Sequence, residues 1–184
     1  MTLLKKSLLA VVASVMLASC GSLTSLTSSL GSANNTKVAD ATVAKSIKTK
    51  DLYGAWAVAD DDPIDFLYVV VLTPNHVGLN FLTIDEKDGK PESRYSEYYS
   101  WEFNEKDNIF TSHAVKRKTI EKGQPEVEED IQETDHYETT LYMDGNKPLA
   151  IRFVKPGEKY TFLKMDDEMY QRMVEGIPDI PSLK

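Results

Sequence analysis

The sequence predicts an all-β domain, an antiparallel meander of eight or nine short strands that forms a small barrel, followed by a C-terminal helix. Apolar and polar residues alternate from residue 51 onward, tight turns separate the alternating runs, and no segment with a helical period lies between them. Sequential hairpins of this kind are typical of a meander that closes, or nearly closes, on itself. The length of 184 residues and a hydrophobic content of 41% suit one domain with its own core.

The strands follow one another along the chain. The early strands are expected at residues 53–59, 66–72, 76–84, 95–103 and 109–120, and the late ones at 137–143, 149–153 and 160–165. In the fourth, Tyr95, Tyr99, Trp101 and Phe103 share one face, which Glu97 interrupts. The acidic residues 126–135 form either a strand with a solvated face or a loop, and they can pair with the basic residues 116–118 across a hairpin.

A helix is expected after the last strand. Asp166 supplies an N-cap, and Asp167 and Glu168 place negative charge at the positive end of the helix dipole. Gly176 can end the helix, and Pro178 prevents it from continuing. We expect this helix to pack against the barrel wall or to plug one end.

The N-terminal segment has the parts of a secretory signal. Lys5 and Lys6 precede an apolar run from Leu8 to Ala18. That run is shorter than the roughly 20 residues that a membrane-spanning helix needs. The run ends next to Cys20, the single cysteine of the chain.

The residues Leu17-Ala18-Ser19-Cys20 resemble the lipobox of bacterial lipoproteins. The resemblance implies that a diacylglyceryl group is attached to the Cys20 thiol, that the signal is cut before Cys20, and that the new amino terminus is acylated. The chain would then comprise a signal peptide (1–19), a lipidated cysteine with a flexible tether (20–50) and the barrel domain with its helix (51–184). The alternative is an ordinary signal peptide with an incidental cysteine.

The residues after Cys20 bear on where the protein lies. In Gram-negative bacteria an Asp in the next position favours the inner membrane, so Gly21 implies, by the same resemblance, the outer membrane facing the periplasm. Residues 21–36 are uncharged and low in complexity, which predicts a tether. Leucines at 23, 26 and 30 leave open a short amphipathic piece on the lipid.

The net charge argues against nucleic acid as a partner. Removal of residues 1–19, which hold two lysines and no acidic residue, changes the net charge of −8 to −10. Such a surface repels nucleic acid and anionic membrane faces. The expected association with a membrane is therefore through the N-terminal lipid.

Gly54-Ala55-Trp56 opens the first predicted strand and resembles the Gly-x-Trp signature of lipocalins and other calycins. The resemblance implies a barrel in which Trp56 packs across the floor, Gly54 lets the preceding segment approach closely, and a basic side chain from a late strand, Arg152, covers the indole. Residues 134–137 match the Thr-Asp-Tyr corner of that family only loosely, because a histidine is inserted. The alternative is that Trp56 is a core aromatic of another β-fold.

An eight-stranded barrel is either filled by side chains or holds one small ligand. A bound small hydrophobic molecule or lipid would be lined by aromatic side chains, with tyrosine hydroxyls to orient it. The candidate lining residues are Tyr53, Trp56, Tyr68, Phe81, Tyr95, Tyr99, Trp101 and Phe103. The alternative is a filled core, with the domain binding a protein or glycan partner through its surface.

Catalytic and metal-binding motifs are not found in the sequence. There is no Gly-x-Ser-x-Gly elbow, no His-Glu-x-x-His and no phosphate loop, so neither an enzyme nor a cofactor is predicted. The three histidines, His76, His113 and His136, are scattered over different predicted elements, whereas a metal site needs several converging ligands. Only His136, beside Asp135 and the acidic run, suggests weak cation binding.

Overall fold

The fold is described from a computed structural model, which covers residues 38–58, 66–85, 92–178 and 183. The predicted signal peptide, Cys20, Gly21 and the uncharged residues 21–36 lie outside the described residues.

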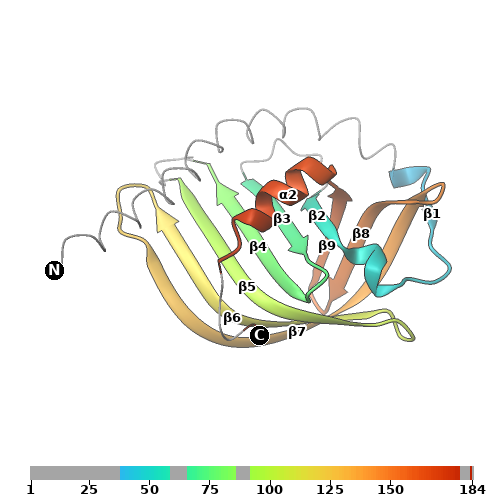
Figure 1. The fold of residues 1–184 in the computed structure, drawn as a ribbon, viewed down its shortest axis with the longest axis horizontal. Helices are drawn as coiled ribbons and strands as arrows, with labels where there is room; N and C mark the ends of the chain where they lie inside the picture. Colours follow the sequence, from blue (N-terminus) through green and yellow to red (C-terminus); the bar gives the residue numbers. More distant parts are fainter. Residues whose placement is uncertain (1–37, 59–65, 86–91, 179–182, 184) are drawn as a thin grey trace.

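The described residues form one antiparallel sheet that closes into a barrel (Figure 1). Eight strands follow the order β7-β6-β5-β4-β3-β2-β9-β8, and the pairing of β8 with β7 closes the ring. A ninth strand, β1, pairs with the end of β7. The strands are β1 (Thr42–Val43), β2 (Gly54–Val58), β3 (Phe66–Leu72), β4 (Val77–Ile84), β5 (Ser93–Asn104), β6 (Ile109–Glu121), β7 (Val127–Asp144), β8 (Lys147–Lys155) and β9 (Glu158–Lys164). The all-β prediction, with its barrel and C-terminal helix, is confirmed.

The acidic segment that the sequence left open belongs, from Val127 onward, to β7. Its carboxylates lie opposite the basic residues of β6, with Lys116 beside Asp130, Arg117 beside Glu129, and Lys118 beside Glu128. Opposite charges placed directly across an antiparallel pair stabilise the pairing. The strand form of this segment is therefore explained by its partner, and the basic and acidic runs do meet across a hairpin.

Three clusters of buried apolar side chains form the core, one on the inner face of the sheet and two on its outer face. The inner face holds the main core, in which Trp56, Leu72, Leu141, Ile151 and Phe162 are almost completely buried. The second cluster, on the outer face of strands β2 to β5, lies against the C-terminal helix. Because successive strand residues point to opposite faces, β2, β3 and β5 each contribute to both of these clusters, whereas outward residues of β7, β8 and β9 form the third, smaller cluster of Tyr142, Ala150 and Leu163.

Helix α2 (Asp167–Glu175) lies across the outer face of the barrel and does not plug an end (Figure 1). The Asp166 carboxylate caps it by accepting a hydrogen bond from the Met169 amide at 2.8 Å. Tyr170 and Met173 pack against the outer cluster.

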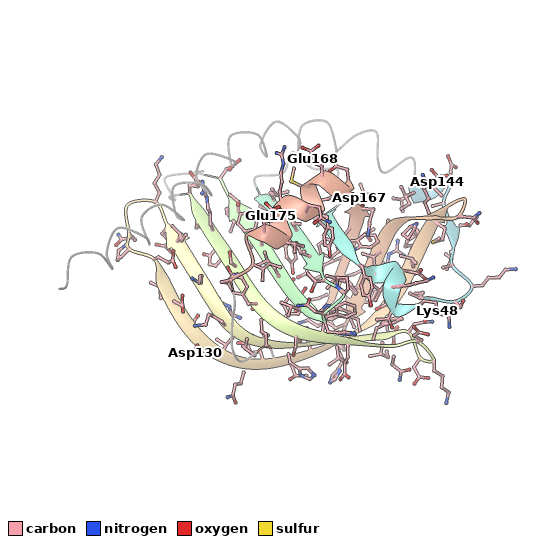
Figure 2. The ribbon with its side chains drawn as sticks, viewed as in Figure 1. Lys48, Asp130, Asp144, Asp167, Glu168 and Glu175 are labelled. Atoms are coloured by element: carbon pink, nitrogen blue, oxygen red, sulfur yellow. The ribbon has the colours of Figure 1, made fainter. Side chains whose placement is uncertain are left out.

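Acidic side chains are distributed over several parts of the surface, as Figure 2 shows for Asp130, Asp144, Asp167, Glu168 and Glu175.

The barrel floor is built around Trp56, which is fully buried and donates its indole N–H to the Leu52 carbonyl at 2.9 Å. The cation over its ring is Lys164, with the ammonium nitrogen 4.2 Å from the ring centre. The expectation of Arg152 in this role is wrong. Ile151 and Phe153 on either side of Arg152 point into the core, so Arg152 points outward, where its guanidinium lies 4.8 Å from the Tyr142 ring centre.

Part of the predicted tether belongs to the folded domain. Ile47 is 3% exposed and lies in the main core, and the Ala44 amide donates to the Leu141 carbonyl at 2.9 Å. A 3-10 helix, η1 (Thr49–Leu52), follows, and the Thr49 amide donates to the Glu105 carboxylate at 2.8 Å. The folded domain therefore begins before residue 51.

Over the part of the chain that the structure describes, no helix is long and apolar enough to cross a membrane.

Candidate ligand cavity in the barrel

A continuous chain of aromatic rings in contact runs through the barrel interior. The ring centres of Trp101 and Phe110 are 5.7 Å apart, those of Phe110 and Phe153 are 4.9 Å apart, and those of Phe153 and Phe162 are 6.0 Å apart. These separations are typical of favourable aromatic pairs. These rings therefore fill much of the interior around them.

A cavity lies against three of these rings, those of Phe110, Phe153 and Phe162. The centre of a water molecule can move within about 30 Å³ of it, which is room for one or two waters. The lining is formed by four tyrosines (Tyr68, Tyr99, Tyr137, Tyr160), three phenylalanines (Phe110, Phe153, Phe162), Val70, and the polar residues Asn80, Glu97, Ser112 and Asp135. Side chains of Glu97 and Asp135 are 25% and 42% exposed, so the cavity reaches solvent on their side.

Tyr99 is the most deeply buried of the four tyrosines. Its residue is 1% exposed, and its ring lies directly over Gly78, where an added Cβ would overlap the ring carbon Cε2. Among the described residues, the hydroxyls of Tyr99 and Tyr68 have no hydrogen-bond partner. Burial raises the pKa of both phenols, so they remain neutral and can donate or accept a hydrogen bond. Neither hydroxyl is among the fully buried polar atoms without a partner, so both are open to the cavity, and an occupant of it, either water or a ligand, can bind them.

The other two tyrosines have acidic partners. The hydroxyl of Tyr137 donates to Asp135 at 3.3 Å, and the hydroxyl of Tyr160 donates to Glu158 at 3.2 Å. Burial, followed by the charge of Asp135, raises the pKa of Tyr137 to about 12. All four tyrosines are therefore neutral at physiological pH.

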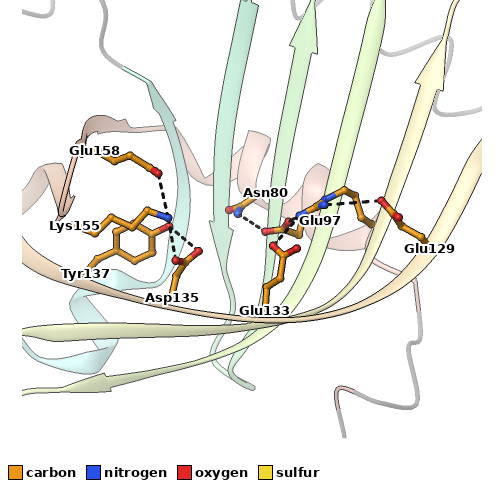
Figure 3. Close-up of polar contacts among 9 residues, drawn as sticks. Asn80, Glu97, Glu129, Glu133, Asp135, Tyr137, Lys155 and Glu158 are labelled. Atoms are coloured by element: carbon orange, nitrogen blue, oxygen red, sulfur yellow. Dashed lines mark hydrogen bonds and ion pairs between the residues drawn. The ribbon is translucent and has the colours of Figure 1, made fainter.

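Two groups of ion pairs border the cavity (Figure 3). In the first, Arg117 lies 2.8 Å from Glu97, 3.0 Å from Glu133 and 3.9 Å from Glu129. The amide of Asn80 also donates to Glu97, at 3.3 Å. One guanidinium is thus shared by three carboxylates, which leaves this group net negative.

The second group is centred on Lys155. Its ammonium lies 2.9 Å from Asp135 and 3.4 Å from Glu158, and 5.2 Å from the centre of the Tyr137 ring. Figure 3 shows Lys155 between the two carboxylates, with Tyr137 beside Asp135. One ammonium is shared by two carboxylates, so this group is also net negative.

The predicted lining residues separate into distinct places. Tyr68 and Tyr99 line the cavity. Trp56 and Trp101 lie in the filled core, with Tyr53 and Phe103 packed beside it. Tyr95 is half-buried on β5. Phe81 lies in the outer cluster near α2, because its neighbour Asn80 points into the barrel.

Several lining residues were not anticipated from the sequence, above all Glu97, Asp135 and Tyr137. The signal for Glu97 was present, since it interrupts an aromatic face and must share the direction of that face. Asp135 and Tyr137 stand two residues apart and therefore point the same way along β7. Nothing in the sequence indicated that this way is inward.

The histidines do not gather with the acidic residues. Asp135 points into the barrel, whereas His136 points outward, with its Nδ1 3.0 Å from the Thr111 hydroxyl. His113 also faces outward, and its Nδ1 lies 3.0 Å from the Thr134 hydroxyl. Within the described ranges no three His, Cys, Asp or Glu side chains are arranged to hold a metal ion.

Comparison with protein-family models, curated proteins and solved structures gave no match to this chain.

Proposed function

We propose that the protein is a lipid-anchored protein of the bacterial cell envelope whose barrel binds a small, largely apolar molecule. The anchoring rests on the lipobox-like residues before Cys20 and on the charged and apolar segment that precedes them. Removal of the signal and acylation of Cys20 would place the barrel at a membrane surface, and more than one acyl chain is needed for stable attachment. The absence of Asp after Cys20 supports the outer membrane, facing the periplasm.

The observation that carries ligand binding is the Tyr99 hydroxyl. It belongs to a side chain that is almost completely buried, lines a cavity inside the barrel, and has no hydrogen-bond partner among the described residues. Ligand pockets typically combine aromatic walls with a few polar groups that orient the ligand. The free space is only about 30 Å³. A small group of the ligand would therefore enter the cavity, and the rest of the ligand would extend toward solvent.

Native mass spectrometry of the full chain, released from nanodiscs, tests binding. A co-purifying mass of a few hundred daltons that leaves on denaturation supports the proposal. Tyr99→Phe should reduce retention of that mass while changing the free energy of unfolding by less than about 0.5 kcal/mol, because no hydrogen bond within the protein is lost. Tyr142→Phe, a buried tyrosine outside the cavity, is the matched control and should retain the mass.

Metabolic labelling with a radioactive fatty acid in a Gram-negative host tests the anchor. The wild-type chain should carry the label and sediment with the outer membrane, and Cys20→Ala should carry none. An unlabelled wild-type chain in the periplasmic fraction would contradict the lipid anchor. It would favour the alternative that residues 1–19 are an ordinary signal peptide and that Cys20 is not acylated.

A second candidate function is an interaction module with a filled core. The small size of the cavity favours it, as does the rim of the barrel, where Phe66 and Ile84 are cross-strand neighbours and each is 36% exposed. Exposed apolar groups of this kind can belong to a protein-binding surface. A bare protein in the mass spectrum, with no binding of added apolar acids, alcohols or amines, would favour this function over ligand binding.

A further inference from the structure

We infer that the ligand of the barrel is a small amine: a protonated ammonium group attached to an apolar or aromatic body. This inference rests on the proposed function, because it names the chemical class that the same cavity would take. It follows from the charge of the lining, from the unpaired tyrosine hydroxyls, and from the size of the free space.

The charged groups that face the cavity are both acidic. Glu97 and Asp135 line it, and no Lys or Arg side chain of the described residues does. Their cationic partners, Arg117 and Lys155, lie to the side and are shared with other carboxylates. The seven charged groups of the two ion-pair clusters are the carboxylates Glu97, Glu129, Glu133, Asp135 and Glu158 and the cations Arg117 and Lys155.

This surplus of carboxylates determines which ligand charge is accepted. A carboxylate or phosphate that entered the cavity would meet Glu97 and Asp135, while both neighbouring cations are already paired. A cation would gain from the same two groups, because like charges repel and opposite charges attract most strongly where water is partly excluded. The chemistry of the lining therefore disfavours a fatty acid and favours an ammonium group.

The hydrogen-bonding capacity of the lining fits the same group. An ammonium has three donors and no acceptor. The hydroxyl oxygens of Tyr68 and Tyr99, which have no partner among the described residues, can accept from it, as can the Glu97 and Asp135 carboxylates. An ammonium would thus satisfy hydroxyls that the protein leaves unpaired.

The free volume matches a small head group. Space for one or two waters accommodates an ammonium but not an acyl chain or a ring. The body of the ligand would contact aromatic rings of the lining, in which Tyr160 forms an edge-to-face pair with Tyr68, with ring centres 5.8 Å apart.

Calorimetric titration of the full chain in nanodiscs of zwitterionic lipid tests the inference. The probes are phenethylamine, phenethyl alcohol and phenylacetate, which share one aromatic body and differ in head-group charge, and empty nanodiscs give the background. We expect the amine to bind about tenfold more tightly than the alcohol, and phenylacetate to show no binding. Equal or tighter binding of the alcohol or phenylacetate would overturn the inference and leave ligand binding by the barrel intact.

Variants separate the charge of the cavity from its shape. Glu97→Gln and Asp135→Asn should each weaken amine binding about fivefold or more and leave alcohol binding unchanged, which also shows that the cavity is still folded. Glu102→Gln is the control, since Glu102 lies on β5 with a side chain that is 72% exposed and does not line the cavity. If amine binding survives both cavity variants, the inference is wrong. If none of the three probes binds at millimolar concentration, the proposed ligand binding itself fails.

Discussion

The ammonium nitrogen of Lys164 lies 4.2 Å from the centre of the Trp56 ring and donates a hydrogen bond to the Tyr53 carbonyl. Lys164 on β9 and Trp56 on β2 are cross-strand neighbours. Gly54 makes this contact possible, because a Cβ in its position would overlap the Lys164 nitrogen. The contact between the Lys164 ammonium and the Trp56 indole therefore depends on the absence of a side chain at residue 54.

Replacement of Gly54 by alanine should destabilise the protein. The residue has φ of +136°, which L residues rarely adopt, and the new methyl would collide with Lys164. We expect a loss of about 2–3 kcal/mol in the free energy of unfolding, measured with urea. Gly145→Ala is the control, since Gly145 also has positive φ but nothing lies within 4 Å of the place that its new methyl would take, and it should cost about 1 kcal/mol. Equal losses would show that neither the φ of +136° nor the contact with Lys164 adds to the cost at Gly54.

The stability of the barrel should rise with pH through the titration of Lys164. Burial lowers the pKa of Lys164 to about 8, whereas an unfolded lysine titrates near about 10.4. Between these values the unfolded chain binds a proton that the folded chain has released, so stability increases with pH. Urea unfolding between about pH 7.5 and about pH 9.5 should show this increase in the wild type and lose most of it in Lys164→Met. Higher pH is avoided because the buried tyrosines act in the opposite direction above about pH 10.

Gly78 and Tyr99 should be energetically coupled. The Tyr99 ring occupies the space that a side chain at residue 78 would fill, with ring carbons Cε2 and Cζ nearest to the Cβ position. Gly78→Ala alone should cost about 1–3 kcal/mol of unfolding free energy through overpacking. With Tyr99→Leu also present, the combined loss should be smaller than the sum by at least about 0.5 kcal/mol. Tyr98→Leu, on the outer face, is the control and should add to Gly78→Ala without coupling.

Glu128 should titrate far below an ordinary glutamate. Hydrogen bonds from Lys116 and then Lys118 lower its pKa to about 2. Its stabilising effect is therefore complete above the ordinary glutamate pKa of about 4.3 and is lost as the pH falls toward about 2. NMR titration should report the low value, and Lys116→Ala should move it upward, while Lys147→Ala should not. An unshifted Glu128 in the wild type would contradict the cross-strand pairing of its side chain in solution.

The strands and the helix were predictable because their signals are local. Alternating residues place Trp101 and Phe103 on one face whatever lies around them, and Asp166 caps the helix by contacting an amide three residues away. The charges of residues 116–118 and 126–135 made their pairing predictable, because opposite runs on consecutive segments can meet in a hairpin.

The positions of single side chains inside the barrel depended on the tertiary structure. Lys164 covers Trp56, and Arg152 does not, because the alternation of side chains along β8 turns Arg152 outward. A shift of the strand register by one residue would turn Arg152 inward. On β4 both faces carry apolar residues, so only closure of the barrel decided that Asn80 points inward and Phe81 outward. By itself, then, the sequence determined the strands, the helix and the candidate lipid-anchor residue, whose signals lie within a few neighbours. The cavity with Glu97, Asp135 and Tyr99 was decided by the closure of distant strands, because it exists only where they meet.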